Sequence, residues 1–115
     1  MSARTRAAAS RGRPGAAPLF AALGDETRLR LVNRLCAKGP LSIARLTEGA
    51  DVTRQAVTKH LHVLAGAGLV RSVRVGRERV WELEPRRVEE ARRCLDAISS
   101  QWDAALGRLS ALVER

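Results

Sequence analysis

The chain has 115 residues and a net charge of +9, and 45% of its residues are hydrophobic although only 3% are aromatic. This length suits one domain that folds without disulfides or a structural metal. The scarcity of aromatic side chains predicts a wholly aliphatic core. It also disfavours single-strand nucleic-acid binders, which stack bases on aromatic platforms. No apolar run approaches the roughly 18 residues that a membrane span needs. Cys36 and Cys94 lack CxxC spacing, which favours a reducing cytoplasm.

The positive charge is unevenly distributed along the chain. Residues 1–16 carry four arginines and no acid. Their composition predicts a disordered basic arm that either grips DNA electrostatically or only keeps the chain soluble. Residues 51–80 hold six Lys or Arg residues against two acidic ones. Such a local basic segment favours a polyanionic partner, although a solvated arginine-rich surface has the same composition.

The predicted order of elements is four helices, a β-hairpin and one long helix. Helices are expected where Pro or a capping side chain precedes an apolar stripe, and strands where apolar and polar residues alternate. One side of the third helix is expected to carry Ile43, Leu46 and Ala50. The predicted hairpin turn is Gly76-Arg77. The expected elements are helices from Pro18 to Leu23, from the Asp25 cap to Lys38, from the Ser42 cap and from the Thr53 cap to about Gly66, strands 69–75 and 78–84, and a final helix of about 28 residues from Pro85.

The fourth predicted helix separates into an apolar face and a polar face. At about 100° per residue, Val57, Leu61 and Leu64 fall on one side. The opposite side carries hydrogen-bonding side chains of intermediate length, namely Gln55, Thr58, Lys59 and His62. Gln can make a bidentate contact to adenine and Thr can contact a thymine methyl, whereas Lys neutralises a phosphate or reaches guanine. The pattern favours a helix that reads base edges over a routine amphipathic surface helix.

The neighbours of this helix strengthen that interpretation. A four-residue connection, 49–52, precedes it and suits two helices that cross steeply, as in a helix-turn-helix unit. Thr53 and Arg54 stand at its N-terminus, the end that enters the groove first. The hairpin that follows carries Arg77 at its tip and Arg79 close by. Such charges suit a DNA backbone or a minor groove, although they can also protect a sheet edge.

The final helix carries an unbroken heptad seam, because apolar residues recur at alternating intervals of three and four. The seam comprises Val88, Ala91, Leu95, Ile98, Trp102, Ala105, Leu109 and Leu112. It is longer than a small domain needs for its own core, which favours dimerisation over intramolecular cover. Trp102 is the largest apolar group in it and the expected anchor.

The stretch from Leu19 to Leu83 resembles the ArsR family of bacterial repressors. The resemblance lies in ALGDETRLRLVNRL (22–35), LS-x-A-x-L (41–46), VTRQAVTKHLHVLAGAGLV (52–70) and VGRERVWEL (75–83). It implies a winged helix-turn-helix homodimer that occupies a promoter until a signal releases it. The family pairs its first and last helices, which adds Leu19 and Phe20 to the expected interface. Asp51 and Thr47 depart from the family pattern without threatening the fold.

The metal-sensing positions of this family are not matched. Where some relatives carry a Cys-x-Cys-Asp run, this chain has Ser42, Ala44 and Arg45, and its last helix has no histidine. Arg45 would repel a cation. His60 and His62 point about 200° apart on one helix and cannot chelate one ion. No metal and no cofactor are therefore expected.

Other functions fit the residues less well. No Ser-His-Asp set, metal cluster or Gly-rich phosphate loop points to an enzyme. Relatives that sense reactive sulfur use one cysteine on the second helix and one on the last, so Cys36 and Cys94 leave a thiol- or persulfide-responsive repressor as an alternative. A winged-helix protein-interaction module would have a neutral or acidic reading helix, and a nonspecific nucleoid-type binder would lack base-reading groups. Both are further alternatives.

The combined prediction is a mainly α fold with a small β-hairpin wing. It is divided into a basic arm (1–16), a winged helix-turn-helix DNA-binding domain (17–84) and a dimerisation helix (85–115). The expected function is that of a cytoplasmic, autoregulatory repressor. It binds an inverted-repeat operator in double-stranded DNA as a homodimer, with reading-helix centres about one DNA turn apart. The residues expected to contact DNA are Thr53, Arg54, Gln55, Thr58, Lys59, His62, Arg77 and Arg79.

Overall fold

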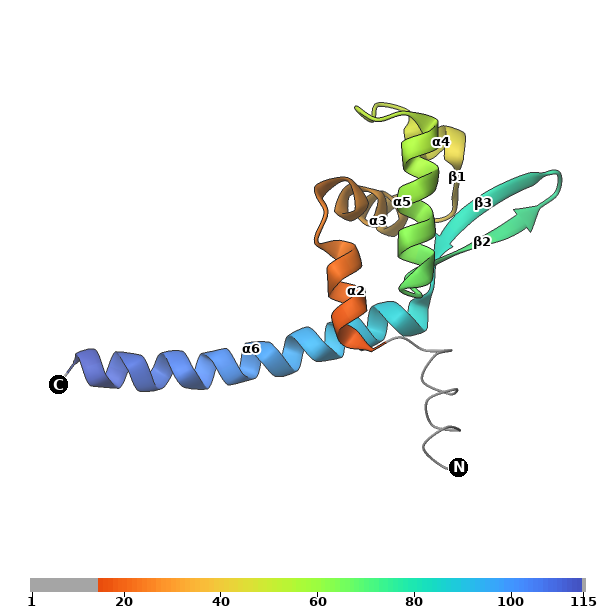
Figure 1. Ribbon diagram of the computed structural model, residues 1–115. Coiled ribbons are helices and arrows are strands. Elements are labelled where there is room, and N and C mark those ends of the chain that lie inside the picture. The colour runs from red at the N-terminus through yellow and green to blue at the C-terminus, as the bar shows by residue number, and fades with distance from the viewer. Residues whose placement is uncertain (1–14, 115) are drawn as a thin grey trace, which may run out of the picture.

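The computed structural model describes residues 15–114, in which short helices pack together, a small antiparallel sheet projects from one side of them and one long helix leaves this body (Figure 1). Almost all of the predicted basic arm lies outside the described residues. The elements in chain order are α2 (Ala16–Leu23), α3 (Glu26–Lys38), β1 (Leu41–Ser42), α4 (Ile43–Thr47), α5 (Arg54–Gly66), β2 (Val70–Val75), β3 (Glu78–Leu83) and α6 (Pro85–Val113). This order confirms the predicted mainly α fold with a hairpin wing. None of the helices in these residues has the length and apolar character needed to cross a membrane.

Three predicted capping side chains occupy the N-cap positions of their helices. The Asp25 carboxylate accepts a hydrogen bond from the Arg28 backbone N–H at 3.0 Å, which lowers the pKa of Asp25. Ser42 and Thr53 cap α4 and α5 in the same way, each accepting from the backbone N–H three positions on. These caps satisfy N–H groups that a helix leaves unbonded in its first turn. Short polar residues therefore determine where these helices begin.

Two helix boundaries differ from the prediction. α2 begins two residues before Pro18, which therefore lies inside the first turn. Proline is tolerated there because the first N–H groups of a helix have no partner to lose. α4 ends at Thr47, so Ala50 lies exposed in the following turn instead of on the helix. In that turn Gly49 has a left-handed backbone conformation, with a φ of 72°. Asp51, which departs from the family pattern at the turn, therefore does not have to adopt this conformation.

The sheet has the strand order β1-β3-β2, and both strand pairs are antiparallel. β2 and β3 form the predicted hairpin, with a two-residue turn at Gly76-Arg77. Gly76 has a φ of 64°, a conformation that tight hairpin turns require and that glycine adopts freely. β1 pairs Leu41 with Trp81. The sequence does not predict β1, because two residues show no alternation.

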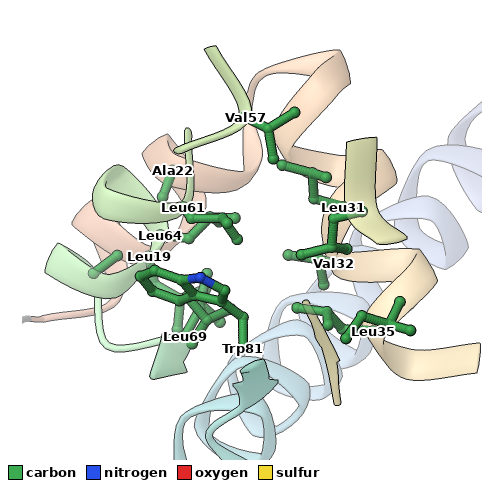
Figure 2. Packing of buried hydrophobic residues seen from close by; sticks show 14 residues of the cluster. Leu19, Ala22, Leu31, Val32, Leu35, Val57, Leu61, Leu64, Leu69 and Trp81 are labelled. Atoms are coloured by element: carbon green, nitrogen blue, oxygen red, sulfur yellow. The ribbon is translucent and has the colours of Figure 1, made fainter. Parts of the chain in front are cut away.

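The core lies between the helices and the inner face of the sheet (Figure 2). Leu46, Leu61 and Leu64 have no exposed surface, and burying each leucine contributes about 1.5–3 kcal/mol relative to an exposed one. Trp81 from β3 packs among them and is 5% exposed. The prediction of a wholly aliphatic core is therefore wrong at this position. The apolar packing holds α5 by one side only.

α6 begins on this body and then runs away from it (Figure 1). Val88 and Ala91 pack against the core, so the first two positions of the heptad seam cover the protomer itself. Beyond them, no other described element lies beside the helix in Figure 1. The seam is therefore covered by its own protomer at the start and uncovered further along.

Candidate nucleic-acid interface

α5 is anchored by one face, which leaves its other face open. Val57, Leu61 and Leu64 have no exposed surface, as helical spacing predicts, and Figure 2 shows all three directed into the core. α5 packs against α2, α3, α4 and β2, so its position is set from several sides. Its polar face therefore points away from the body.

The predicted residues of α5 lie together on that open face. We term this set the reading face, and its members are Thr53, Arg54, Gln55, Thr58, Lys59 and His62. All are exposed except Thr58, which is half-buried. Within residues 15–114, the side chains of Gln55 and Lys59 make no hydrogen bond or ion pair, so both are available to a partner. Thr58 donates its hydroxyl proton to the Arg54 backbone oxygen at 2.9 Å. Its methyl group and its accepting capacity stay free for a base.

His62 connects the reading face to the wing. Its ring meets that of Trp81 edge-on, with centroids 5.8 Å apart and planes at 90°, a favourable aromatic geometry. Trp81 belongs to β3, so this contact joins α5 to the base of the hairpin. His60 lies elsewhere, with Nδ1 3.3 Å from an Arg28 guanidinium nitrogen. The two histidines therefore occupy separate surroundings, as the helical spacing predicts.

The hairpin places two arginines directly opposite each other. Arg74 and Arg79 are register partners, on the same face of the sheet as Trp81, because side chains two residues apart share a face. Like charges in opposite positions destabilise a strand pair, and neither arginine has an ion-pair partner among the described residues. A polyanion would relieve this repulsion. Arg74 is missing from the predicted site, although a two-residue turn at 76–77 already implies its pairing with Arg79.

The two other arginines of the hairpin differ in availability. Arg77 is exposed at the turn and makes no ion pair in the described part of the chain. Arg71, at the base, donates to Glu82 at 2.9 Å and to Glu84 at 3.1 Å. The hydrogen bond that Arg71 donates to Glu82, together with the negative charges of Glu84 and Glu82, raises the pKa of Arg71. The net positive charge of residues 51–80 is therefore larger than the charge that is free to bind a partner. Glu82 and Glu84, which pair with Arg71, lie just beyond that segment and are not counted in it.

Arg34 holds the helix-turn-helix unit together. Its guanidinium donates to the backbone oxygens of Arg45, Leu46 and Glu48 at 2.8, 2.8 and 3.2 Å. These oxygens lie at the end of α4, a five-residue helix whose last carbonyls lack helical partners. Arg34 therefore fixes α4 against α3, and α4 in turn packs on the reading helix.

The predicted dimer residues divide into a buried group and an exposed group. Leu19 is 1% exposed in the protomer's own core, so we withdraw it from the proposed interface, and Phe20 is partly buried against that core. On α6, Trp102 is 67% exposed. Leu106 and Val113, which follow Trp102 toward the C-terminal end of α6, are also exposed. We term the outward seam the α6 stripe, and its members are Leu95, Ile98, Trp102, Ala105, Leu109 and Leu112.

A metal or redox site would use the histidine, cysteine and acidic side chains. Among the described residues, no three such side chains gather closely enough to hold a metal ion. Cys36 is exposed on α3 and Cys94 is half-buried on α6, and both are free thiols. A response of these thiols to oxidants stays a prediction.

Comparison with known proteins agrees with this geometry. Residues 23–73 match the sequence profile of a helix-turn-helix domain. The chain is 39% identical over 93 residues to the HTH-type transcriptional regulator Rv2034 of Mycobacterium tuberculosis, which covers 81% of this chain and 83% of that protein. An ArsR-like transcriptional regulator from Rhodococcus sp. RHA1 has a similar structure, with a TM-score of 0.67, 36% identity and coverage of 84% of this chain and 90% of its own. The chain belongs to the ArsR family.

An ArsR-family chain of this kind is a DNA-binding transcriptional regulator and not an enzyme. The assignment confirms the resemblance carried by the sequence motifs. The fold is also shared with a homodimeric winged helix-turn-helix DNA-binding domain from Mycobacterium bovis, at a TM-score of 0.56 and 20% identity, over 76% of this chain and 78% of that one. At this identity the similarity concerns the fold alone.

Proposed function

We propose that this ArsR-family protein is a homodimeric repressor that binds an inverted-repeat operator in double-stranded DNA, including one in its own promoter. The observation that carries the proposal is the reading face, where Gln55 and Lys59 stand open beside the unpaired wing arginines Arg74 and Arg79. Base-reading groups flanked by phosphate-binding charges are what sequence-specific recognition of a major groove requires. A repressor of this kind acts in the cytoplasm, where the bacterial chromosome lies.

We assign the residues of this surface to two kinds of contact. Arg54, Gln55 and Thr58 lie in the first turns of α5, the end that enters the major groove, and take base edges. The remaining residues carry positive charge or flank the groove, and the phosphate contacts fall to Thr53, Lys59, His62, Arg74, Arg77 and Arg79. Arg77 at the tip of the wing also suits a narrow minor groove, whose negative potential attracts arginine.

The α6 stripe supplies the two-fold partner in this proposal. Leu95, Trp102 and Leu109 are exposed at heptad spacing on a helix that leaves the body (Figure 1). A second copy of α6 can cover them, because a heptad seam is complementary to itself across a two-fold axis. Such a dimer presents two reading helices to successive major grooves. The operator is therefore expected to be an inverted repeat with centres about one DNA turn apart.

Footprinting on DNA from the protein's own promoter tests the proposal. We expect protection of an inverted repeat, with one dimer per site and an affinity well above that for random DNA. Light scattering at micromolar concentration should give a dimer without DNA, and a monomer would contradict the proposal. Protection without sequence preference would support a nonspecific nucleoid-type binder. Absence of binding to any DNA would support a protein-interaction module.

We further propose that release from the operator is independent of metal. Ser42 uses its hydroxyl oxygen to cap α4, Ala44 offers no donor atom, and Arg45 carries a charge that repels a cation. Adding zinc, cadmium or arsenite at stoichiometric levels should leave operator affinity unchanged. A loss of affinity at equimolar metal would show that ligands lie elsewhere in the chain and would end this assignment.

A further inference from the structure

Arg87 is a buried charge that belongs to neither the reading face nor the α6 stripe. It lies in the first turn of α6 and is 6% exposed, and it is the one charged side chain buried among residues 15–114. A guanidinium is costly to remove from water unless hydrogen bonds and charge compensate it. At this depth it can contact neither DNA nor a second copy of the chain. Its role therefore lies within the protomer.

The guanidinium of Arg87 joins three parts of the chain. Nε donates to the Ala67 backbone oxygen at 2.9 Å, at the C-cap of α5, and Nη2 donates to the Gly15 oxygen at 2.6 Å, just before α2. Nη1 pairs with Glu90, one turn further along α6, at 2.8 Å. Figure 1 shows the end of α5 and the start of α2 meeting the first turns of α6. Arg87 therefore connects the reading helix to the helix that carries the α6 stripe.

Gly68 forms the turn beside this connection, because its backbone adopts a left-handed conformation that other residues rarely take. Its φ is 81°, and a Cβ at this position would lie 3.5 Å from Nε of Arg87 and 3.6 Å from its Cδ. The chain thus turns sharply after α5 and passes against the arginine side chain. The Ala67 oxygen is one of the carbonyls at a helix end that have no helical partner. Arg87 satisfies it from α6, where water would otherwise do so.

We infer that Arg87 is a positioning residue that fixes the reading helix relative to the dimer helix, and so sets the half-site spacing that the protein selects. The inference rests on the proposed function, since it needs a dimer formed through α6. In that dimer each reading helix is connected to the two-fold axis through the contacts between α5, α2 and α6. If these contacts are rigid, the two reading helices are held at one fixed separation. Moving a half-site by one base pair also rotates it by about 36° around the DNA axis, so a stiff protein should discriminate strongly.

Operators whose half-sites are moved together or apart by one or two base pairs test the inference. Arg87→Met removes all three hydrogen bonds, and Arg87→Lys keeps the charge but cannot reach three separated acceptors. Arg86→Met is the matched control, because Arg86 lies in the same turn and is exposed. We expect the wild type and the control to prefer one spacing. For Arg87→Met, the ratio of affinities between the best and the neighbouring spacings should fall towards one, with Arg87→Lys in between.

This ratio is measured within each variant, so a lower folded fraction changes every affinity equally and cancels. If both Arg87 variants keep the spacing profile of the Arg86 control, the inference is overturned and the proposed repressor stands. If the wild type itself shows no spacing preference, the proposed dimeric function fails and the inference fails with it. If Arg87→Met gives too little folded protein to titrate, the profile of Arg87→Lys decides by the same criterion.

Discussion

The reading face with its wing and the α6 stripe differ in the kind of side chain that each leaves uncovered. The first region presents amides, hydroxyls and positive charges, and its wing sets Arg74 opposite Arg79. The second presents leucines, an isoleucine and the largely exposed Trp102. Each composition indicates its own partner, because a polyanion attracts uncompensated charge and exposed apolar surface is covered by other apolar surface.

This difference makes the two associations separable by experiment. Contacts to phosphates release counterions and weaken steeply as salt rises, whereas a heptad interface depends on apolar burial, which salt does not weaken. Operator affinity should therefore fall with salt while the dimer persists. A substitution on the reading face or the wing should leave the dimer intact, whereas loss of the dimer should weaken operator binding through lost avidity.

Trp102→Asp is expected to have the largest effect, because it places a charge in the middle of the α6 stripe. The protein should become monomeric. Its operator affinity should fall by about 10²–10⁴-fold, the range by which linking two binding modules raises avidity. Light scattering and operator titration measure the two changes. Ser100→Asp is the control, since Ser100 is exposed about 200° away on the same helix. If the Trp102→Asp protein stays dimeric, the dimer interface lies on a surface other than the α6 stripe.

Gln55→Ala should lower specificity and leave the dimer unchanged. Loss of a bidentate amide contact costs about 1–3 kcal/mol at each half-site and little on random DNA. The ratio of operator to random-DNA affinity should therefore fall, as competition titrations would measure. Asn33→Ala removes an exposed amide from α3 and should leave the ratio as it is. If Gln55→Ala keeps the full operator preference, α5 is not the helix that reads the bases.

Arg34→Met tests an arginine that belongs to neither exposed region. The free energy of unfolding should fall by about 1–3 kcal/mol, because the carbonyls that end α4 lose their hydrogen-bond donors. Arg30→Met is the matched control, one turn earlier on α3. Its ion pair with Glu26 is exposed on both sides, so its loss should cost about 0.5 kcal/mol or less. Urea unfolding measures both, and equal losses would contradict the structural role of Arg34.

Most of the fold follows from signals that lie close together in the sequence. Asp25, Ser42 and Thr53 precede apolar stripes and do cap their helices. The hairpin follows from alternation around Gly76, and the long helix from the seam after Pro85. The reading face follows from helical periodicity alone, because one side of α5 had to be apolar. These features need no knowledge of distant contacts.

The features that the sequence could not show depend on contacts between distant elements. Leu19 is an apolar residue on a short helix, which suits a core as well as an interface, and only packing decides that it is buried. Arg71 loses its free charge to acids on the neighbouring strand and beyond it. Some arginines that look like surface charges instead donate to backbone oxygens at helix ends, and these are Arg28, Arg34 and Arg87. A charge count treats all of them alike.

The smallest effect is expected from the wing, where Arg77→Ala removes an exposed charge from the turn. A plot of the logarithm of the binding constant against that of salt concentration should become less steep by about one unit for each protomer. Affinity for operator and for random DNA should fall alike, because the phosphates of both are the same. Titrations at several salt concentrations on both kinds of DNA measure the slope and the ratio together.

Arg71→Ala is the matched comparison for Arg77→Ala, because it removes the same charge from the same hairpin. Glu82 and Glu84 already hold the Arg71 guanidinium, so little of its charge is left to displace counterions from DNA. The salt slope should therefore change much less than with Arg77→Ala, even though both side chains are exposed. If the two variants shift the slope equally, net charge alone governs binding by the wing. The distinction between free and paired arginines on this surface would then be wrong.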